Sequence, residues 1–202
     1  WDPQAALAAQ LALPGNRSRE YNIANIYGRW ATTDPQAALA SALQLKDAAA
    51  RDNSVRRVLS QIALTDAPGA IQAASQLTGR MREQALGEIA RIWAGRDAAA
   101  ALQWAQNAPK ESERRATLRS IMPELARSDI QSAVRFLESL PVGTLKNELV
   151  GSLLGTWSYT DPQAMMNWVN SQPPGALKKN ALIQAINQLS YQAPVTAAPL
   201  LS

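Results

Sequence analysis

Carboxylates are the side chains of this sequence with the most scope for chemistry, because the chain contains no His and no Cys. That absence excludes disulfides, Cys/His zinc sites and every mechanism that uses a His base. Two neighbouring carboxylates could still act as a general acid and a general base.

Six of the Asp residues recur, however, at spacings of 31 or 32 residues, and Pro directly follows three of them. They are Asp2, Asp34, Asp66, Asp97, Asp129 and Asp161. Asp before Pro is typical of a helix start, so we interpret these carboxylates as N-caps.

Other chemical motifs are missing. The Glu residues show no metal-ligand spacing supported by a second ligand type. No Gly-x-Ser-x-Gly elbow and no glycine-rich phosphate loop occurs. The sequence therefore predicts no catalytic residue, no metal site and no cofactor, and we expect a protein that is not an enzyme.

The composition is that of a chain with a sizeable core and a modest positive charge. Apolar residues make up 47% of the 202 residues, and the formal net charge is +4. This charge is well below that of a dedicated nucleic-acid binder. No segment approaches 18 consecutive apolar residues, so no membrane span is predicted. The chain opens at Trp1 without an initiator Met, and we expect it to be a piece of a longer protein.

The recurring Asp residues divide the chain into repeats of about 32 residues. The predicted repeats are 2–33, 34–65, 66–96, 97–128, 129–160 and 161–192, followed by a partial repeat, 193–202. In each, apolar residues at helical spacing follow the Asp for about eleven residues. Pro and Gly then end this first helix, and a second apolar stripe indicates a longer second helix. The third repeat is one residue short, and we place the deletion in the turn at 78–79.

One helix pair cannot bury its apolar stripe alone, whereas stacked pairs share a continuous core. The predicted fold is therefore all-α: a right-handed αα-superhelix (solenoid) of about six helix-turn-helix repeats, forming a single domain over 1–202. The helix-turn-helix unit resembles the tetratricopeptide and Sel1-like class, although the Trp–Leu-Gly–Tyr pattern is absent and the period differs. The repeat is also similar to repeats in exported bacterial proteins. The resemblance implies no catalytic residues.

A cation recurs near the start of every predicted second helix. These residues, the cation ladder, are Arg19, Arg51, Arg82, Arg114, Lys146 and Lys178. A cation at that end opposes the helix dipole, so another partner must favour it, and the carbonyl end of the first helix is nearby. This structural role is one interpretation. The other is an anion-binding edge, which the doubled cations at 56–57, 114–115 and 178–179 support.

An aromatic column, defined by Trp104, Phe136 and Trp168, occupies one position of the last three first helices. It also has two interpretations. An aromatic at helical spacing is usually core packing. The alternative is a partner-binding strip on the concave surface of the first helices.

The function predicted from these patterns is a non-catalytic scaffold that binds a protein or peptide on the concave surface of the solenoid. One alternative is modular binding of nucleic acid or another polyanion along the cation ladder. Another is the non-catalytic helical arm of a larger enzyme. The terminal repeats lack clear polar caps, which also suggests self-association.

Overall fold

The computed structural model describes residues 1–192, and these residues form twelve α-helices, one short 3₁₀ helix and no strand. The all-α prediction is therefore confirmed for this part of the chain. The chain divides into two compact units, Trp1–Trp93 and Ala94–Ser202. The boundary between them falls at the end of the third predicted repeat. The predicted partial repeat, 193–202, lies outside the described residues.

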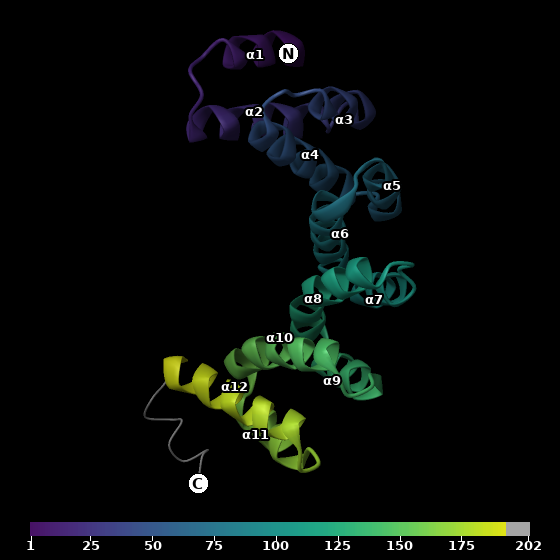
Figure 1. Ribbon diagram of the computed structural model, residues 1–202, viewed down its shortest axis with the longest axis vertical. Coiled ribbons are helices and arrows are strands. Elements are labelled where there is room, and N and C mark those ends of the chain that lie inside the picture. Colours follow the sequence, from purple (N-terminus) through teal and green to yellow (C-terminus); the bar gives the residue numbers. More distant parts are fainter. Residues whose placement is uncertain (193–202) are drawn as a thin grey trace. The chain divides into compact units, whose positions relative to one another are not determined.

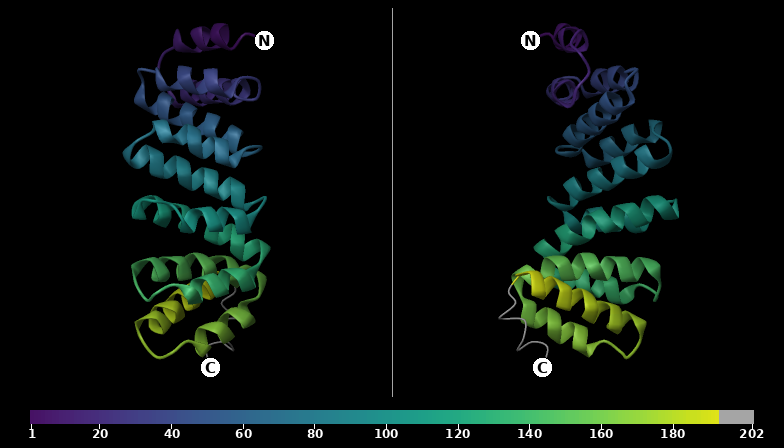
Figure 2. Two further views of the ribbon diagram at one scale, coloured as in Figure 1. Left: turned by 90° about the vertical axis from the view of Figure 1, so that its right-hand side faces the viewer. Right: turned by 60° about the vertical axis from the view of Figure 1, so that its left-hand side comes forward.

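Each unit contains three pairs of helices, a short one followed by a long one (Figures 1 and 2). The pairs of the N-terminal unit are α1 (Pro3–Leu11) and α2 (Arg17–Trp30), α3 (Pro35–Leu43) and α4 (Ala48–Ala63), and α5 (Ala67–Ala73) and α6 (Gly79–Ala94). Those of the C-terminal unit are α7 (Ala98–Gln106) and α8 (Glu111–Ser128), α9 (Ile130–Ser139) and α10 (Thr144–Thr160), and α11 (Pro162–Ser171) and α12 (Ala176–Gln192). The 3₁₀ helix, Ala74–Gln76, continues α5.

The recurring Asp residues cap the short helices, as predicted. In all six, a side-chain oxygen accepts a hydrogen bond from the backbone N–H three residues later, at 2.8–3.1 Å. Each carboxylate thus satisfies one of the backbone donors that a helix start leaves free. The short helices have seven to ten residues rather than the eleven expected. The remaining residues of the predicted stretch belong to turns or, after α5, to the 3₁₀ helix.

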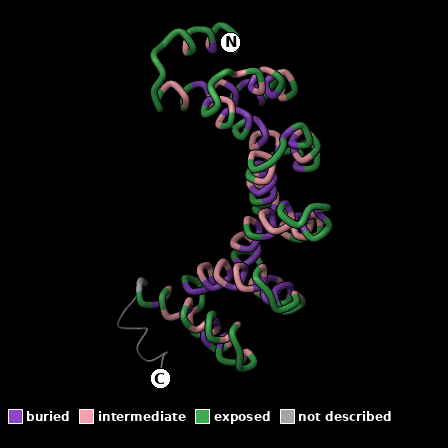
Figure 3. The backbone as a smooth tube through the Cα atoms, in the orientation of Figure 1, coloured by how far each residue is buried: buried purple, intermediate pink, exposed green. Residues whose placement is uncertain are grey.

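The core lies where neighbouring helices of a unit face one another, and Figure 3 shows buried residues along those sides. Small residues of the short helices are fully buried near the first turn, for example Ala38, Ala70 and Ala101 at 0% exposed. A side chain of this size lets one helix approach another closely. The long helices contribute β-branched and aliphatic residues such as Val58 and Ile121, which are at most 1% exposed. This agrees with the apolar faces predicted from the sequence.

The turn that shortens the third predicted repeat depends on a glycine. Gly79 has φ +55°, in the left-handed region, and it begins α6 directly after the turn at 78. A residue without Cβ adopts that conformation at little cost. The structure thus shows an unusual backbone at the turn where the deletion is predicted.

No helix among residues 1–192 is both long enough and apolar enough to cross a membrane.

The caps give a direct test of how much the helix starts contribute to stability. We expect Asp161→Ala to lower the free energy of unfolding by about 1 kcal/mol, because the N–H of Ala164 loses its acceptor. Asp161→Asn keeps an acceptor and should cost only a few tenths of a kcal/mol. Asp52→Ala, at an exposed Asp that is not a cap, is the control. Urea denaturation of the three variants measures these differences, and equal losses for Asp161→Ala and Asp52→Ala would contradict the capping role.

Candidate functional site

The cation ladder links the two helices of each pair. Each of its side chains donates a hydrogen bond to a backbone carbonyl in the last turn of the preceding short helix or just beyond it. The acceptors are Leu13 at 2.9 Å, Leu45 at 3.5 Å, Ala74 at 3.1 Å, Ala108 at 3.4 Å, Leu140 at 2.9 Å and Asn170 at 2.6 Å. A cation at a helix C-terminus satisfies free carbonyls and interacts favourably with the helix dipole. The structural role predicted for the ladder is therefore confirmed.

Lys146 is the most buried member of the ladder, at 8% exposed. Its ammonium donates to two carbonyls, Leu140 O at 2.9 Å and Glu138 O at 3.3 Å. At the other end of the chain, Arg19 also lies 3.6 Å from the carboxylate of Asp47. Because the ladder cations already donate to carbonyls, a bound anion would have to share these donors. Anion binding by the ladder stays a prediction.

The aromatic column falls on three consecutive short helices of the C-terminal unit, and its members differ. Phe136 is buried in the core, at 6% exposed. Trp104 and Trp168 are half-buried. The Trp168 indole N–H donates to Glu138 Oε1 at 3.1 Å, and its ring lies 6.0 Å from that of Trp157. The core interpretation thus holds for Phe136, whereas partner binding by the column stays a prediction.

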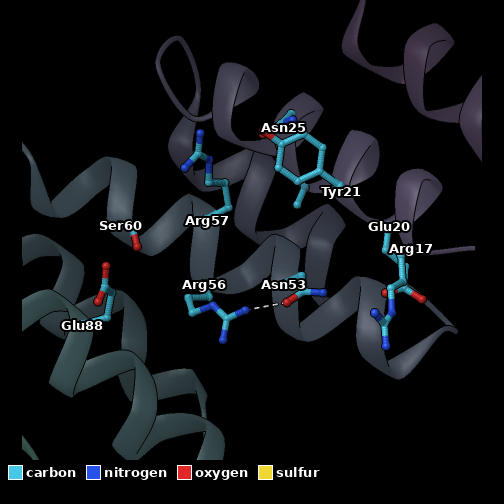
Figure 4. A pocket seen from close by; sticks show the side chains of 10 residues that line it. Arg17, Glu20, Tyr21, Asn25, Asn53, Arg56, Arg57, Ser60 and Glu88 are labelled. Atoms are coloured by element: carbon cyan, nitrogen blue, oxygen red, sulfur yellow. Dashed lines mark hydrogen bonds between the residues drawn. The ribbon is translucent and has the colours of Figure 1, made fainter.

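A pocket of about 340 Å³ lies on the long helices of the N-terminal unit (Figure 4). Residues of α2 and α4 form most of it, and Glu88 of α6 closes one side. Its lining residues are Arg17, Glu20, Tyr21, Ala24, Asn25, Asn53, Arg56, Arg57, Ser60 and Glu88. Three guanidinium groups, two carboxylates and an exposed tyrosine therefore surround one hollow.

The charges of this pocket are unevenly neutralised. Glu88 accepts two hydrogen bonds from Arg91, at 2.7 and 3.0 Å, and this contact, with the nearby charge of Arg56, lowers the pKa of the Glu88 carboxyl. Arg56 donates to the neutral Asn53 side chain at 2.5 Å, which Figure 4 shows as a dashed line. Among residues 1–192, no hydrogen bond or ion pair engages the guanidinium of Arg17 or Arg57. The pocket therefore holds cations that the fold itself does not use.

A glycine on α2 determines how closely Arg57 can lie. A Cβ added to Gly28 would sit 2.9 Å from both Cγ and Nε of Arg57, which is closer than side chains tolerate. The missing Cβ lets the stem of Arg57 cross α2 at this point. Gly28 thus positions one of the pocket's cations.

A second hollow, of about 560 Å³, lies between α3 and α5 in the same unit. Leu39 and Ile62 contribute apolar surface to it, and Gln36 and Gln72 contribute amides. Its one charged residue is Asp66, which already caps α5. This hollow therefore offers less chemistry than the pocket on the long helices, although it is larger.

The sequence reasoning missed the pocket because its lining residues do not recur as a set in every repeat. The doubled cation at 56–57 was the one signal that pointed there. No group of three or more acidic residues among residues 1–192 is arranged to hold a metal ion. Comparisons with protein-family models, with curated proteins and with solved structures gave no match to this chain.

The ladder contact of Lys146 can be measured as stability. Lys146→Met keeps an apolar stem of similar length but leaves two carbonyls without their donor. We expect Lys146→Met to lower the free energy of unfolding by about 2 kcal/mol. Lys146→Arg keeps a cationic donor and should lower it much less. Lys179→Met, on an exposed side chain of α12, is the matched control and should stay within about 0.5 kcal/mol. A Lys146→Met variant as stable as this control would show that the carbonyls need no cation.

The contact between Gly28 and Arg57 predicts coupling between two substitutions. Replacing Gly by Ala inside a helix normally stabilises it by about 1 kcal/mol. In the wild-type background, where the new methyl group meets Arg57, we expect Gly28→Ala not to raise the free energy of unfolding. In the Arg57→Ala background the same substitution should raise it by about 1 kcal/mol. A double-mutant cycle by thermal or urea unfolding measures the difference. An equal effect in both backgrounds would mean that Arg57 does not lie over Gly28.

Proposed function

We propose that this chain is an αα-solenoid scaffold that binds a protein or peptide and performs no catalysis. The succession of helix pairs supports the solenoid, since the same Asp cap and the same cation link recur in all six pairs. Repeats held together in this way contact mainly their neighbours and present long surfaces to partners.

The observation that carries the proposal is the pocket on α2, α4 and α6. Tyr21 is 69% exposed at its edge, and Arg17 and Arg57 have no partner within the described residues. Tyrosine and arginine are the residue types that protein interfaces favour, because they combine a large contact area with directional hydrogen bonds. An open hollow of this kind suits side chains of a peptide better than a small reacting molecule, which requires an enclosed site.

Polyanion binding along the cation ladder is the second candidate, and it has less support. The ladder side chains bond to carbonyls of their own helix pairs, so a phosphate would compete with contacts that hold the pairs together. The aromatic column of the C-terminal unit remains a second candidate surface for a protein partner. A role as the helical arm of a larger enzyme is compatible with either surface.

Site-specific photo-crosslinking tests the proposal. Tyr21 is replaced by p-benzoylphenylalanine in one variant and Tyr159 in another. Both tyrosines are highly exposed, at 69% and 74%, but only Tyr21 lines the pocket. After irradiation with cell extract at low and at high salt, we expect Tyr21 to give a distinct crosslinked polypeptide that Tyr159 does not give.

The outcome separates the two candidate functions. A polypeptide captured at Tyr21 and retained at high salt supports the scaffold, because contacts in a pocket are screened less than exposed charges. Identical products at both tyrosines would argue against a specific site in the pocket. Nucleic acid that is recovered only at low salt would favour the ladder instead, since phosphate binding weakens steeply with salt.

A further inference from the structure

We infer that the pocket of the N-terminal unit binds an acidic peptide, and that Arg56 and Arg57 receive its carboxylates. The inference rests on the proposed function and names the chemical class of the partner. For Arg56 it follows from a comparison with the equivalent arginine of another repeat, Arg119; for Arg57 it follows from the absence of a hydrogen bond or ion pair within residues 1–192.

In the C-terminal unit, arginines on a long helix are paired with a carboxylate of the protein itself. On α8, Arg115 forms an ion pair with Glu148 of the next long helix, and its Nε donates to Glu148 Oε2 at 2.8 Å. Nε of Arg119, one turn further along α8, lies 4.0 Å from the same carboxylate oxygen. One internal carboxylate therefore serves two neighbouring arginines across the boundary between two long helices.

The N-terminal unit has an arginine in the same register without that carboxylate. Arg56 follows the ladder residue Arg51 by five positions, as Arg119 follows Arg114. On the next long helix, Glu148 comes two positions after Lys146, and the equivalent residue after Arg82 is Gln84. An amide carries no charge, so Arg56 is left with Asn53 as its hydrogen-bond partner. No carboxylate of residues 1–192 lies within ion-pair distance of Arg56. The charge of Arg56 does act on Glu88, but both oxygens of that carboxylate already accept hydrogen bonds from Arg91.

The rest of the pocket favours a peptide among possible acidic partners. Guanidinium groups bind carboxylates through two parallel hydrogen bonds, which gives geometric selectivity. Glu20 and Glu88 also line the pocket, and a carboxylate can accept hydrogen bonds from backbone N–H groups, which a peptide has and a nucleic-acid backbone lacks. The exposed ring of Tyr21 adds a flat surface for a side chain or a peptide plane.

Fluorescence anisotropy with a defined probe tests the inference on the whole chain. The probe is a fluorescein-labelled decapeptide of alternating Glu and Ala, and its neutral counterpart carries Gln in place of Glu. We expect the Glu peptide to bind at least about tenfold more tightly than the Gln peptide. Arg56→Gln should weaken binding of the Glu peptide about fivefold, the loss of one partly exposed ion pair.

A second variant tests the internal comparison without removing an arginine. Gln84→Glu installs on α6 the type of carboxylate that Glu148 supplies on α10, so Arg56 gains a competing internal partner. We expect Gln84→Glu to weaken binding of the Glu peptide about fivefold as well. Gln131→Glu makes the same charge change at an exposed residue of α9 and should leave the affinity within about twofold.

Three results would overturn the inference. The first is equal affinity for the Glu and Gln peptides, and the second is equal behaviour of Gln84→Glu and Gln131→Glu. The third is a single-stranded oligonucleotide, of the same net charge as the Glu peptide, that binds more tightly than this peptide. If Arg56→Gln abolished that binding, the pocket would be assigned to nucleic acid. A polypeptide that crosslinks at Tyr21 whether or not Arg56 is present would overturn this inference alone and leave the proposed function in place.

Discussion

The contact on which the fold depends most is the hydrogen bond from a cation of each long helix to the carbonyl end of the short helix before it. The short helices have only seven to ten residues, and isolated helices of fewer than about 12–15 residues are marginal in water. An Asp satisfies one end of each and an Arg or Lys satisfies the other. Because the cation belongs to the following helix, the same bond that satisfies a carbonyl of the short helix or its turn also ties the two helices of the pair together.

This arrangement separates residues that build the molecule from residues that are available to a partner. The Asp caps, the cation ladder and the small buried residues of the short helices recur along the chain, because each pair needs them. The pocket on α2, α4 and α6 includes residues that do not recur, such as Tyr21 and Arg57. Its cations can therefore differ from pair to pair without loss of the fold. The long helices also differ outside this pocket, as the contrast between Gln84 and Glu148 shows, at a position whose side chain contributes to neither cap nor core.

Sequence alone predicted the features that depend on local spacing. The helical class, the six caps and the structural role of the ladder all follow from residues less than ten positions apart, whose geometry a helix and a tight turn largely determine. It did not predict the pocket, since this requires knowing which faces of α2, α4 and α6 remain uncovered. It also could not separate Phe136, which is buried, from Trp168, which is half-buried and bonded to Glu138. The Arg115–Glu148 ion pair joins residues 33 positions apart, and its existence depends on the register between two helices.

The turn before Gly79 has a consequence for how such a chain can change. One residue is missing there, yet Arg82 still donates a hydrogen bond to a carbonyl, that of Ala74. Ala74 follows its capping Asp by eight positions, whereas the acceptor of Arg19, Leu13, follows its capping Asp by eleven. A long, flexible side chain absorbs the difference in chain length, and a glycine in the left-handed region absorbs the change in direction. In this pair the missing residue is therefore accommodated within the turn, and the cation of the long helix keeps a carbonyl acceptor. The turns are the points at which an added loop or a grafted segment would disturb the molecule least.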